Sequence, residues 1–335
     1  MNVNRLRTAL FIAALPFRVA IFRNGGWPDM SCSVEPARDY REFLNRFFTK
    51  NEIEKALNRT DQYLNESKDL SQLNSIFLAD KQYPPLLRHI FDPPPVIFSR
   101  GSQLSIDVEY IAAVGTRYPD RITIEAIDDF GDQLSQMNSI NEVYQKLTNE
   151  PVKAAMPHLN QWQPSLFSES TNNASNQNDS KKNSLVTVSG FAIGVDERVH
   201  RISIYRHIPT VAVLGSGVDH ITPPSNRHLI EESNQFETAL TFLSEFFPNE
   251  MPRKFSYPRR NRIIAGMSPL CIVFQASYRS GALITATFAL EENRDVWAFD
   301  HPKLTAIGKN DGARTLLDQG ATRLKVLQQT KQEMV

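Results

Sequence analysis

Cysteine is nearly absent from this chain, which carries only Cys32 and Cys271 among 335 residues. Two cysteines form neither a disulfide framework nor a spaced metal motif, so we expect a reducing, cytoplasmic setting. The seven histidines are scattered and form no metal-ligand pair. The sequence therefore predicts no metal and no cofactor.

The chain also lacks an excess of charge and a long apolar run. Its net charge is zero, so an anion site must come from local clustering of cations. The apolar run from Ala9 to Phe22 is interrupted by Pro16 and Arg18 and is too short to span a bilayer. It follows two arginines and faintly resembles a signal peptide, but no clear small-residue cleavage site comes after it. We expect a first buried helix or a misplaced start, with export as the remaining alternative, and no membrane partner.

The spaced glycine fingerprint GxGxxG is missing as well, which weakens the case for a dinucleotide site. The chain has instead two valine-rich runs that stop at glycine. Leu185–Val188 precedes Ser189-Gly190, and Thr210–Leu214 precedes Gly215-Ser216-Gly217. With a helix-length stretch between them, these runs predict a parallel βαβ unit. Glycine lets backbone N–H groups approach a ligand, and a helix that begins after such a turn favours anions.

The same alternation of strand and helix continues through most of the chain. It predicts an α/β fold, an extended Rossmann-like, doubly wound, mostly parallel sheet. Strands are expected at Tyr110–Val114, Leu185–Val188, Thr210–Leu214, Ala239–Leu243, Leu270–Gln275 and Asp295–Phe299. Helices are expected from Ile122 to Met137, between residues 190 and 209, and at Asn226–Asn234, Arg259–Gly266, Ala282–Glu292 and Gly308–Gly320. Ligands of such sheets bind at the carboxyl ends of the strands.

Composition divides the chain into three parts. Residues 1–80 are predicted to form a small helical domain, because residues 36–80 have apolar positions at helical spacing and no glycine. Residues 81–325 form the Rossmann-like domain, entered through a proline-rich extended segment. Within it, residues 141–184 are predicted to be a disordered insertion, since much of this stretch is almost devoid of apolar residues. Residues 326–335 are a tail.

The clearest electrostatic feature is Met251–Leu290, which contains six basic residues and neither Asp nor Glu. Arginine forks match phosphate oxygens, and the interleaved Phe255 and Tyr257 can stack on bases. A solvated charged surface is the alternative. For Arg117, which follows the first predicted strand, a phosphate contact and a carboxylate pair remain equally open. Asp196 and His200, four residues apart, form either an acid/base pair or a structural hydrogen bond.

Several motifs together resemble the DNA-processing protein A (DprA/Smf) family. They occur in order and are YPPLLRHIFDPPPVIFSRG at Tyr83–Gly101, IAAVGTRYP at Ile111–Pro119, TVSGFAIGVDERVH at Thr187–His200, PTVAVLGSGVD at Pro209–Asp219, LSEFFP at Leu243–Pro248, PRRNRIIAGMS at Pro258–Ser268 and SGALITATFALEENRDVWAF at Ser280–Phe299. The resemblance implies a non-enzymatic protein that binds single-stranded DNA, loads the RecA recombinase in natural transformation and recombination, and acts as a homodimer.

The resemblance also implies site residues. The phosphate-contact role falls on Arg117, and the basic pocket lies at the glycine turns. Together with the turn argument, the candidate DNA-binding residues are Arg117, Ser189, Gly190, Gly215, Ser216, Gly217, Arg259, Arg260, Asn261, Arg262, Ser280 and Gly281.

Three departures from the family pattern stand out. Ile193 occupies the position of a family arginine, Phe299-Asp300-His301 replaces a VPG sequence, and the following glycine-asparagine stretch is altered to Lys309–Gly312. The missing arginine keeps an alternative open, a Rossmann-like nucleotide-binding enzyme or sensor of the nucleoside-monophosphate phosphoribohydrolase type. Against it, Glu291 and Glu292 lie about three turns along the helix that follows Ser280-Gly281.

Overall fold

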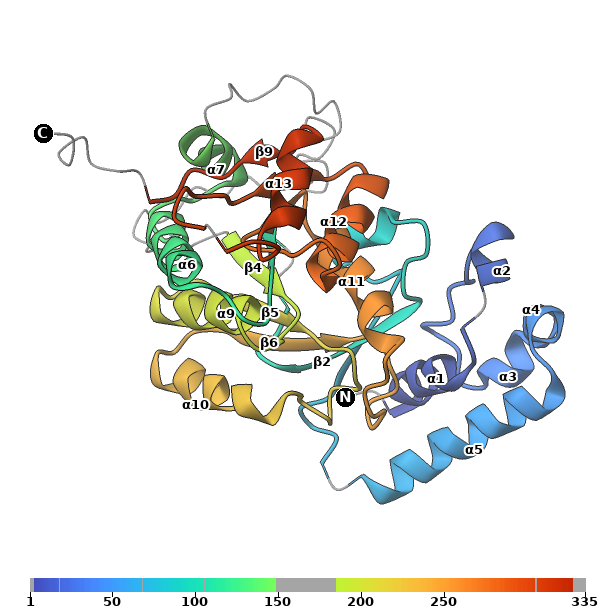
Figure 1. The fold of residues 1–335 in the computed structure, drawn as a ribbon. Helices are drawn as coiled ribbons and strands as arrows, with labels where there is room; N and C mark the ends of the chain where they lie inside the picture. Colours follow the sequence, from blue (N-terminus) through green and yellow to red (C-terminus); the bar gives the residue numbers. More distant parts are fainter. Residues whose placement is uncertain are drawn as a thin grey trace, which may run out of the picture.

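The computed structural model describes residues 3–17, 19–67, 69–104, 107–148, 185–304 and 306–327 (Figure 1). Its centre is a nine-stranded sheet in the order β1-β2-β6-β5-β4-β3-β7-β8-β9. The strands are β1 (Asn74–Phe77), β2 (Val96–Gly101), β3 (Glu109–Val114), β4 (Leu185–Ser189), β5 (Thr210–Val213), β6 (Leu240–Ser244), β7 (Leu270–Val273), β8 (Asp295–Ala298) and β9 (Thr322–Arg323). The α/β fold class and the mostly parallel, doubly wound sheet are therefore confirmed.

Seven strands, from β6 across to β9, run parallel to their neighbours, while β1 and β2 are antiparallel additions at one edge. The chain builds β4, β5 and β6 on one side of β3 and then returns to place β7, β8 and β9 on the other side. The strand order thus reverses between β3 and β7. In open parallel sheets a ligand crevice forms at this switch point, outside the carboxyl ends of the strands.

Helices cover both faces of the sheet (Figure 1). One face packs against η1 (Leu86–His89), α11 (Ser256–Met267), α12 (Gly281–Glu291) and α13 (Asp311–Asp318). The other face packs against α6 (Arg121–Leu134), α7 (Ile140–Leu147), α9 (Val195–Tyr205) and α10 (His228–Gln235), with the short η3 (Pro224–Asn226) before α10. Because both faces are covered, the central strands are buried on both sides, which accounts for their valine-rich sequences.

The N-terminal helices pack against the β1–β2 edge of the sheet. They are α1 (Val3–Ala14), α2 (Val19–Arg23), α3 (Pro36–Asp39), α4 (Arg41–Phe47) and α5 (Lys50–Glu66). The first turn of α5 is fixed by a capping box, in which Thr49 and Glu52 bond each other's backbone N–H. The apolar face of α1 is buried in a cluster that includes Phe98 of β2 and Phe247 after β6. The apolar N-terminal run thus contains a buried helix, as the sequence predicted.

Three details of the sequence prediction need correction. The stretch 36–80 is not helical throughout, because Asn74–Phe77 forms β1 and pairs with β2. The proline-rich segment contains a 3₁₀ turn at Leu86–His89, since its prolines lie before and after the turn and do not interrupt it. The predicted insertion begins too early, because Val143 and Leu147 are buried on α7. Its remainder, residues 149–184, and residues 328–335 of the tail lie outside the described residues.

In the part of the chain that the structure describes, no helix is long and apolar enough to cross a membrane.

Candidate functional site

The expected site lies where β3, β4 and β5 end and α11 begins. We call this region the strand-end rim and define it by Arg117, Gly190, Gly215, Tyr257 and Arg260. Arg117, Gly190 and Gly215 lie in the turns after β3, β4 and β5. Tyr257 and Arg260 lie in the first two turns of α11. The parallel strands bring these turns to one edge of the sheet, as the sequence analysis expected.

Arg260 is the buried cation of the rim. Its side chain is only 5% exposed, and Nη1 donates to the carbonyl oxygen of Val213 at the end of β5. The guanidinium lies directly against Gly190, where an added Cβ would come within 2.2 Å of Nη1. Glycine is therefore required at position 190 to make room for Arg260. The Nε atom of Arg260 is buried and has no hydrogen-bond partner among the described residues.

Asp196 supplies a negative charge next to Arg260. It lies in the first turn of α9, where its carboxylate accepts a hydrogen bond from the backbone N–H of Ala192 (3.3 Å). Burial raises the pKa of Asp196, while the Arg260 guanidinium and hydrogen bonds from the 189–192 turn oppose that rise. Burial likewise lowers the pKa of Arg260, and Asp196 opposes that shift. The turn after β4 is therefore already occupied by an internal carboxylate.

The hydroxyl groups of Ser189 and Ser216 are also used inside the protein. Ser189 donates to the carbonyl oxygen of Ala113 (2.6 Å), and Ser216 donates to that of His220 (2.6 Å). The backbone N–H of Gly217 donates to the backbone carbonyl oxygen of Glu250 (2.8 Å). The expectation that the glycine turns offer backbone N–H donors therefore needs correction at Gly217, and the two hydroxyl groups also stabilise the turns.

Arg117 provides the exposed cation of the rim. Its turn packs against the turn after β4, since a Cβ on Gly194 would lie 2.5 Å from the Arg117 carbonyl oxygen. The backbone N–H of Val195 also donates to Thr116 (3.1 Å). The turn after β4 therefore contacts the Arg260 guanidinium at Gly190 and the Arg117 backbone at Gly194, and the charge of Arg117 contributes to lowering the pKa of Arg260. Arg117 has no ion pair with another residue in the described ranges.

Gly215 and Tyr257 complete the rim at the end of β5. A Cβ on Gly215 would come within 2.9 Å of the Tyr257 ring, so the ring lies against the glycine backbone. Tyr257 remains 37% exposed. The rim thus combines one exposed arginine, one buried arginine and one half-exposed aromatic ring.

Arg259 and Arg262 do not join Arg117 and Arg260, which corrects the expected gathering of arginines. Residues two apart on a helix point to opposite sides, so Arg262 faces away from Arg260. Arg262 contacts Glu245 (2.6 Å) and Asp92 (3.1 Å), and Arg259 contacts Glu245 (2.8 Å). Both arginines line an open cavity of about 800 Å³ in which Asp92 also takes part. Their charges are balanced by carboxylates on the far side of α11.

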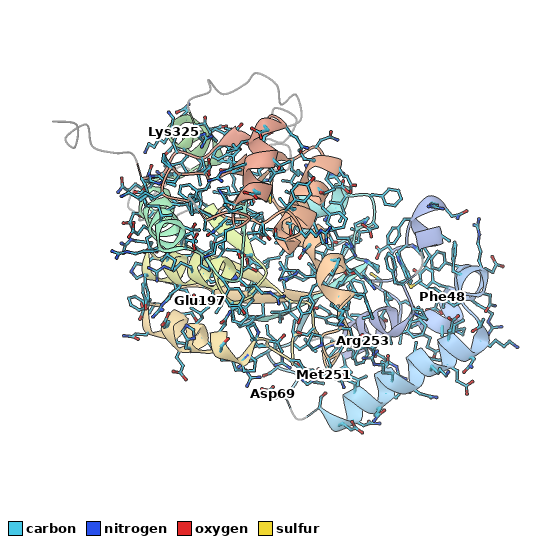
Figure 2. The ribbon with its side chains drawn as sticks, in the orientation of Figure 1. Phe48, Asp69, Glu197, Met251, Arg253 and Lys325 are labelled. Carbon is cyan, nitrogen blue, oxygen red and sulfur yellow. The ribbon has the colours of Figure 1, made fainter. Side chains whose placement is uncertain are left out.

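Arg253, another basic residue of the stretch Met251–Leu290, lies apart from the rim. Figure 2 shows Met251 and Arg253 on the loop between β6 and α11, on the side of the N-terminal helices. Arg253 is exposed, and its guanidinium lies 5.8 Å from the centre of the Phe255 ring. The block is thus divided among the rim, the far side of α11 and the surface.

The start of α12 lies beside the rim but offers a weaker site. Asn261 donates from Nδ2 to the carbonyl oxygen of Gly281 (3.2 Å), which ties α11 to the start of α12. The Oγ atom of Ser280 is buried and has no partner among the described residues. Glu292, at the opposite end of α12, accepts a hydrogen bond from the Phe91 backbone (2.9 Å). The carboxylates considered for a hydrolase are therefore at the far end of the helix.

Asp196 and His200 do not form the acid/base pair that the sequence left open. The Nδ1 atom of His200 bonds the Thr210 hydroxyl (2.8 Å), whereas Asp196 faces the turn after β4. His200 is fully buried, and burial lowers its pKa to about 3. A neutral, buried histidine with a hydroxyl partner is a structural residue here.

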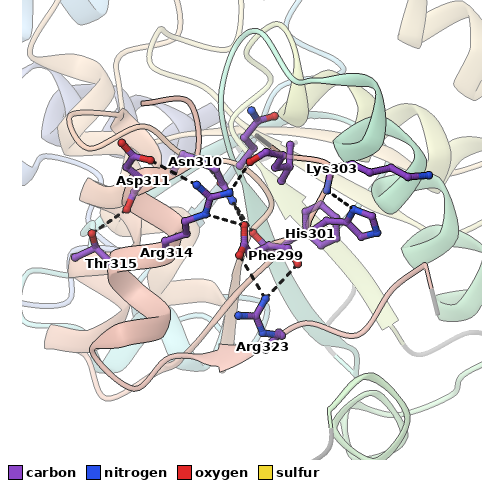
Figure 3. Close-up of polar contacts among 12 residues, drawn as sticks. Phe299, His301, Lys303, Asn310, Asp311, Arg314, Thr315 and Arg323 are labelled. Carbon is purple, nitrogen blue, oxygen red and sulfur yellow. Dashed lines mark hydrogen bonds and ion pairs between the residues drawn. The ribbon is translucent and has the colours of Figure 1, made fainter. Parts of the chain in front are cut away.

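Two polar residues that the sequence analysis missed organise the edge next to the rim. Gln275 is fully buried after β7, where its side chain bonds Asp120 and Thr123. Asn310 bonds the backbone at the ends of both β7 and β8 (Figure 3). The sequence predicted Gln275 at the end of a strand and Asn310 in a helix, and no local pattern identified their roles because their partners are distant in sequence.

Asp300, the middle residue of the Phe299-Asp300-His301 sequence that replaces VPG, is also held in a network. It bonds Arg314 (3.1 Å) and Asn310 (3.0 Å), and Arg323 contacts it at 3.6 Å (Figure 3). The altered stretch is therefore a packed, ion-paired end of β8.

Comparison with known proteins gives a consistent family match. A sequence profile described as DNA recombination-mediator protein A matches residues 74–140 and 167–334. The DNA processing protein DprA of Streptococcus pneumoniae is 31% identical over 255 residues, covering 76% of this chain and 72% of that relative. The profile match begins at Asn74, the first residue of β1, so it covers the sheet but not α1 to α5.

Two solved structures are similar to this chain. The X-ray structure of DNA processing protein A from Streptococcus pneumoniae has a TM-score of 0.59 and 26% identity, covering 91% of this chain and 93% of that one. DNA processing protein A from Helicobacter pylori, described for its single-stranded DNA binding mode, has a TM-score of 0.54 and 21% identity, covering 75% and 90%. The second similarity shows the fold alone.

Proposed function

Since this chain belongs to the DNA recombination-mediator protein A (DprA/Smf) family, we propose that it binds single-stranded DNA at the strand-end rim. The observation that carries the proposal is the pair of neighbouring arginines, Arg117 exposed and Arg260 buried, at the carboxyl ends of β3, β4 and β5. Arg117 has no carboxylate partner among the described residues, so its guanidinium is available to a phosphate.

The two arginines have different roles in the proposal. Arg117 makes a solvent-accessible phosphate contact, which supplies affinity without sequence preference. Arg260 is held by Val213 and by the neighbouring Asp196, so it acts as a fixed positive charge beneath the phosphate. The half-exposed Tyr257 ring lies beside them and can contact a base. This arrangement has no candidate nucleophile or acid/base pair, and we propose that the chain acts by binding rather than by catalysis.

The family relationship extends the proposal to the partner and the process. We propose that the chain protects single strands in the cytoplasm, loads the RecA recombinase onto them during natural transformation and recombination, and works as a homodimer. Family membership supports these roles. A strand-exchange assay on single strands coated with a single-strand-binding protein tests the loading step, with faster exchange expected when this protein is added.

The test of the binding site is a fluorescence anisotropy titration with a labelled single-stranded oligonucleotide. We expect Arg117→Ala to weaken binding and to lower the salt dependence by about 0.7 in log–log slope, the value for one phosphate contact on a single strand. Arg206→Ala is the matched control. Arg206 is also exposed. It follows the last residue of α9, away from the rim, and pairs with Asp132 of α6. Equal affinity for the wild-type protein and Arg117→Ala would refute the site.

A further inference from the structure

The switch point of the sheet, between β3 and β7, carries two exposed tyrosines. Arg117-Tyr118 follows β3, and Tyr278-Arg279 follows β7. Tyr118 is 76% exposed and Tyr278 is 70% exposed. Neither ring has a hydrogen bond or a ring contact with another residue in the described ranges. Two arginine–tyrosine pairs thus flank the crevice in which parallel sheets bind ligands.

The loop that carries Tyr118 is held in place by Gln275. The backbone N–H of Thr116 donates to the carbonyl oxygen of Gln275 (2.7 Å). The side-chain oxygen of Gln275 accepts from the Asp120 backbone (2.9 Å) and from the Thr123 hydroxyl (2.8 Å). Both sides of Tyr118 are therefore fixed to the end of β7, and the ring projects from an anchored turn.

The loop that carries Tyr278 is held in place by Asn310. The Oδ1 atom of Asn310 accepts from the Ala276 backbone (3.2 Å), and its Nδ2 donates to Phe299 at the end of β8 (3.2 Å; Figure 3). The turn then closes through a hydrogen bond from the Ser280 backbone to Ser277 (3.0 Å). Tyr278 and Tyr118 therefore stand on two anchored turns that share the end of β7.

The surroundings of these rings favour a polyanion. Residues 114–119 and 276–281 contain no Asp or Glu. The nearest carboxylate in the first loop, Asp120, is bonded to Lys309 (2.7 Å) and to Gln275 (3.1 Å), which together lower its pKa. Within these two loop segments the charged side chains are those of Arg117 and Arg279, and both residues are exposed.

We propose that Tyr118 and Tyr278 form a platform on which successive bases of a single strand stack, next to the phosphate contacts of the rim. This inference rests on the proposed function and deepens it, because it assigns recognition of the bases as well as of the backbone. Aromatic rings stack on any base, so the platform adds affinity without sequence preference. In a duplex the base faces are covered by their neighbours, so the platform also distinguishes single strands from duplexes.

The experiment uses two probes of equal length, a labelled oligothymidylate and a labelled strand in which every nucleotide is abasic. Tyr118→Ala and Tyr278→Ala are each expected to weaken binding to oligothymidylate about tenfold. Binding to the abasic strand is expected to stay unchanged, and Tyr→Phe at either position is expected to retain wild-type affinity for both probes. Phe91→Ala is the matched control, since this 64% exposed ring lines the cavity on the far side of α11.

The outcomes separate this inference from the function on which it rests. If both alanine variants bind oligothymidylate like the wild type while Arg117→Ala loses binding, the platform is refuted and the rim stands. Equal losses on the abasic strand also refute stacking, because that strand has no bases. If the wild-type protein binds neither probe at low salt, the proposed function and the platform are both refuted.

Discussion

Gly190→Ala perturbs the candidate site through a single added methyl group. The new Cβ would lie 2.2 Å from Nη1 of Arg260 and 2.7 Å from its Cζ, which is closer than any non-bonded contact allows. Gly190 does not have a positive φ angle, so the backbone accepts alanine there. The guanidinium, at the end of a flexible side chain, is therefore the group that must move.

The size of the effect follows from what Arg260 loses. Its bond from Nη1 to Val213 breaks, and its charge leaves the position beside Arg117. An interaction with a charged group contributes about 1.5–3 kcal/mol, so loss of the Arg260 charge from beneath a bound phosphate should lower single-strand affinity about thirtyfold, which corresponds to about 2 kcal/mol. The free energy of unfolding should fall less, by about 1 kcal/mol, because Arg260 can reach solvent after it moves.

The assay is the anisotropy titration over a range of salt concentrations, combined with urea unfolding. If Gly190→Ala acts through Arg260, the double variant Gly190→Ala/Arg260→Met should bind like Arg260→Met alone. Additive losses in the double variant would refute the reasoning, since they would show that Gly190 contributes by another route. Unchanged binding by a folded Gly190→Ala protein would refute it as well.

Three further predictions follow from other contacts. Ile193→Arg restores a cation to the turn after β4, and we expect about tenfold tighter single-strand binding with a salt slope steeper by about 0.7, measured by the same titration. Arg262→Met leaves Asp92 without its arginine and Glu245 paired with Arg259 alone, so urea unfolding should show a loss of about 2 kcal/mol, whereas single-strand affinity should not change. His200 stays neutral in the folded state down to about pH 3 but gains a proton near pH 6.5 when unfolded, so acid destabilises the fold. Between pH 7.5 and pH 5 the wild type should lose about 2 kcal/mol more than His200→Gln in urea unfolding, and equal losses would contradict the buried, neutral histidine.

The central sheet could be predicted from the sequence because its signals are local. Valine-rich runs that end in glycine mark β4 and β5, and the strands around them alternate with amphipathic helices. The edge strand Asn74–Phe77 was missed because it follows a charged helical stretch and pairs with β2 from outside the repeating pattern. The predicted start of the insertion was wrong. Ile140, Val143 and Leu147 have helical spacing, but the polar stretch that follows them favoured an interpretation as insertion.

The site could be predicted only in outline. The sequence placed Arg117 and the glycine turns at one edge, because parallel strands bring their ends together. Helical spacing alone could have separated Arg260 from Arg262, since residues two apart point to opposite sides. The identity of their partners could not be predicted, because Glu245 and Asp92 reach Arg262 from distant segments. The hydrogen bond that Asp196 accepts from Ala192 could not be predicted either, because it depends on how the turn after β4 folds over the start of α9.

The most direct test of the account compares single-stranded and duplex DNA of the same sequence in one salt titration, with the wild-type protein, Arg117→Ala and Arg206→Ala. The account predicts salt-sensitive, preferential binding of the single strand by the wild type and by Arg206→Ala, with weaker binding and a shallower salt slope for Arg117→Ala. Binding that is equal for single strand and duplex, or that is unaffected by the loss of Arg117, would contradict it.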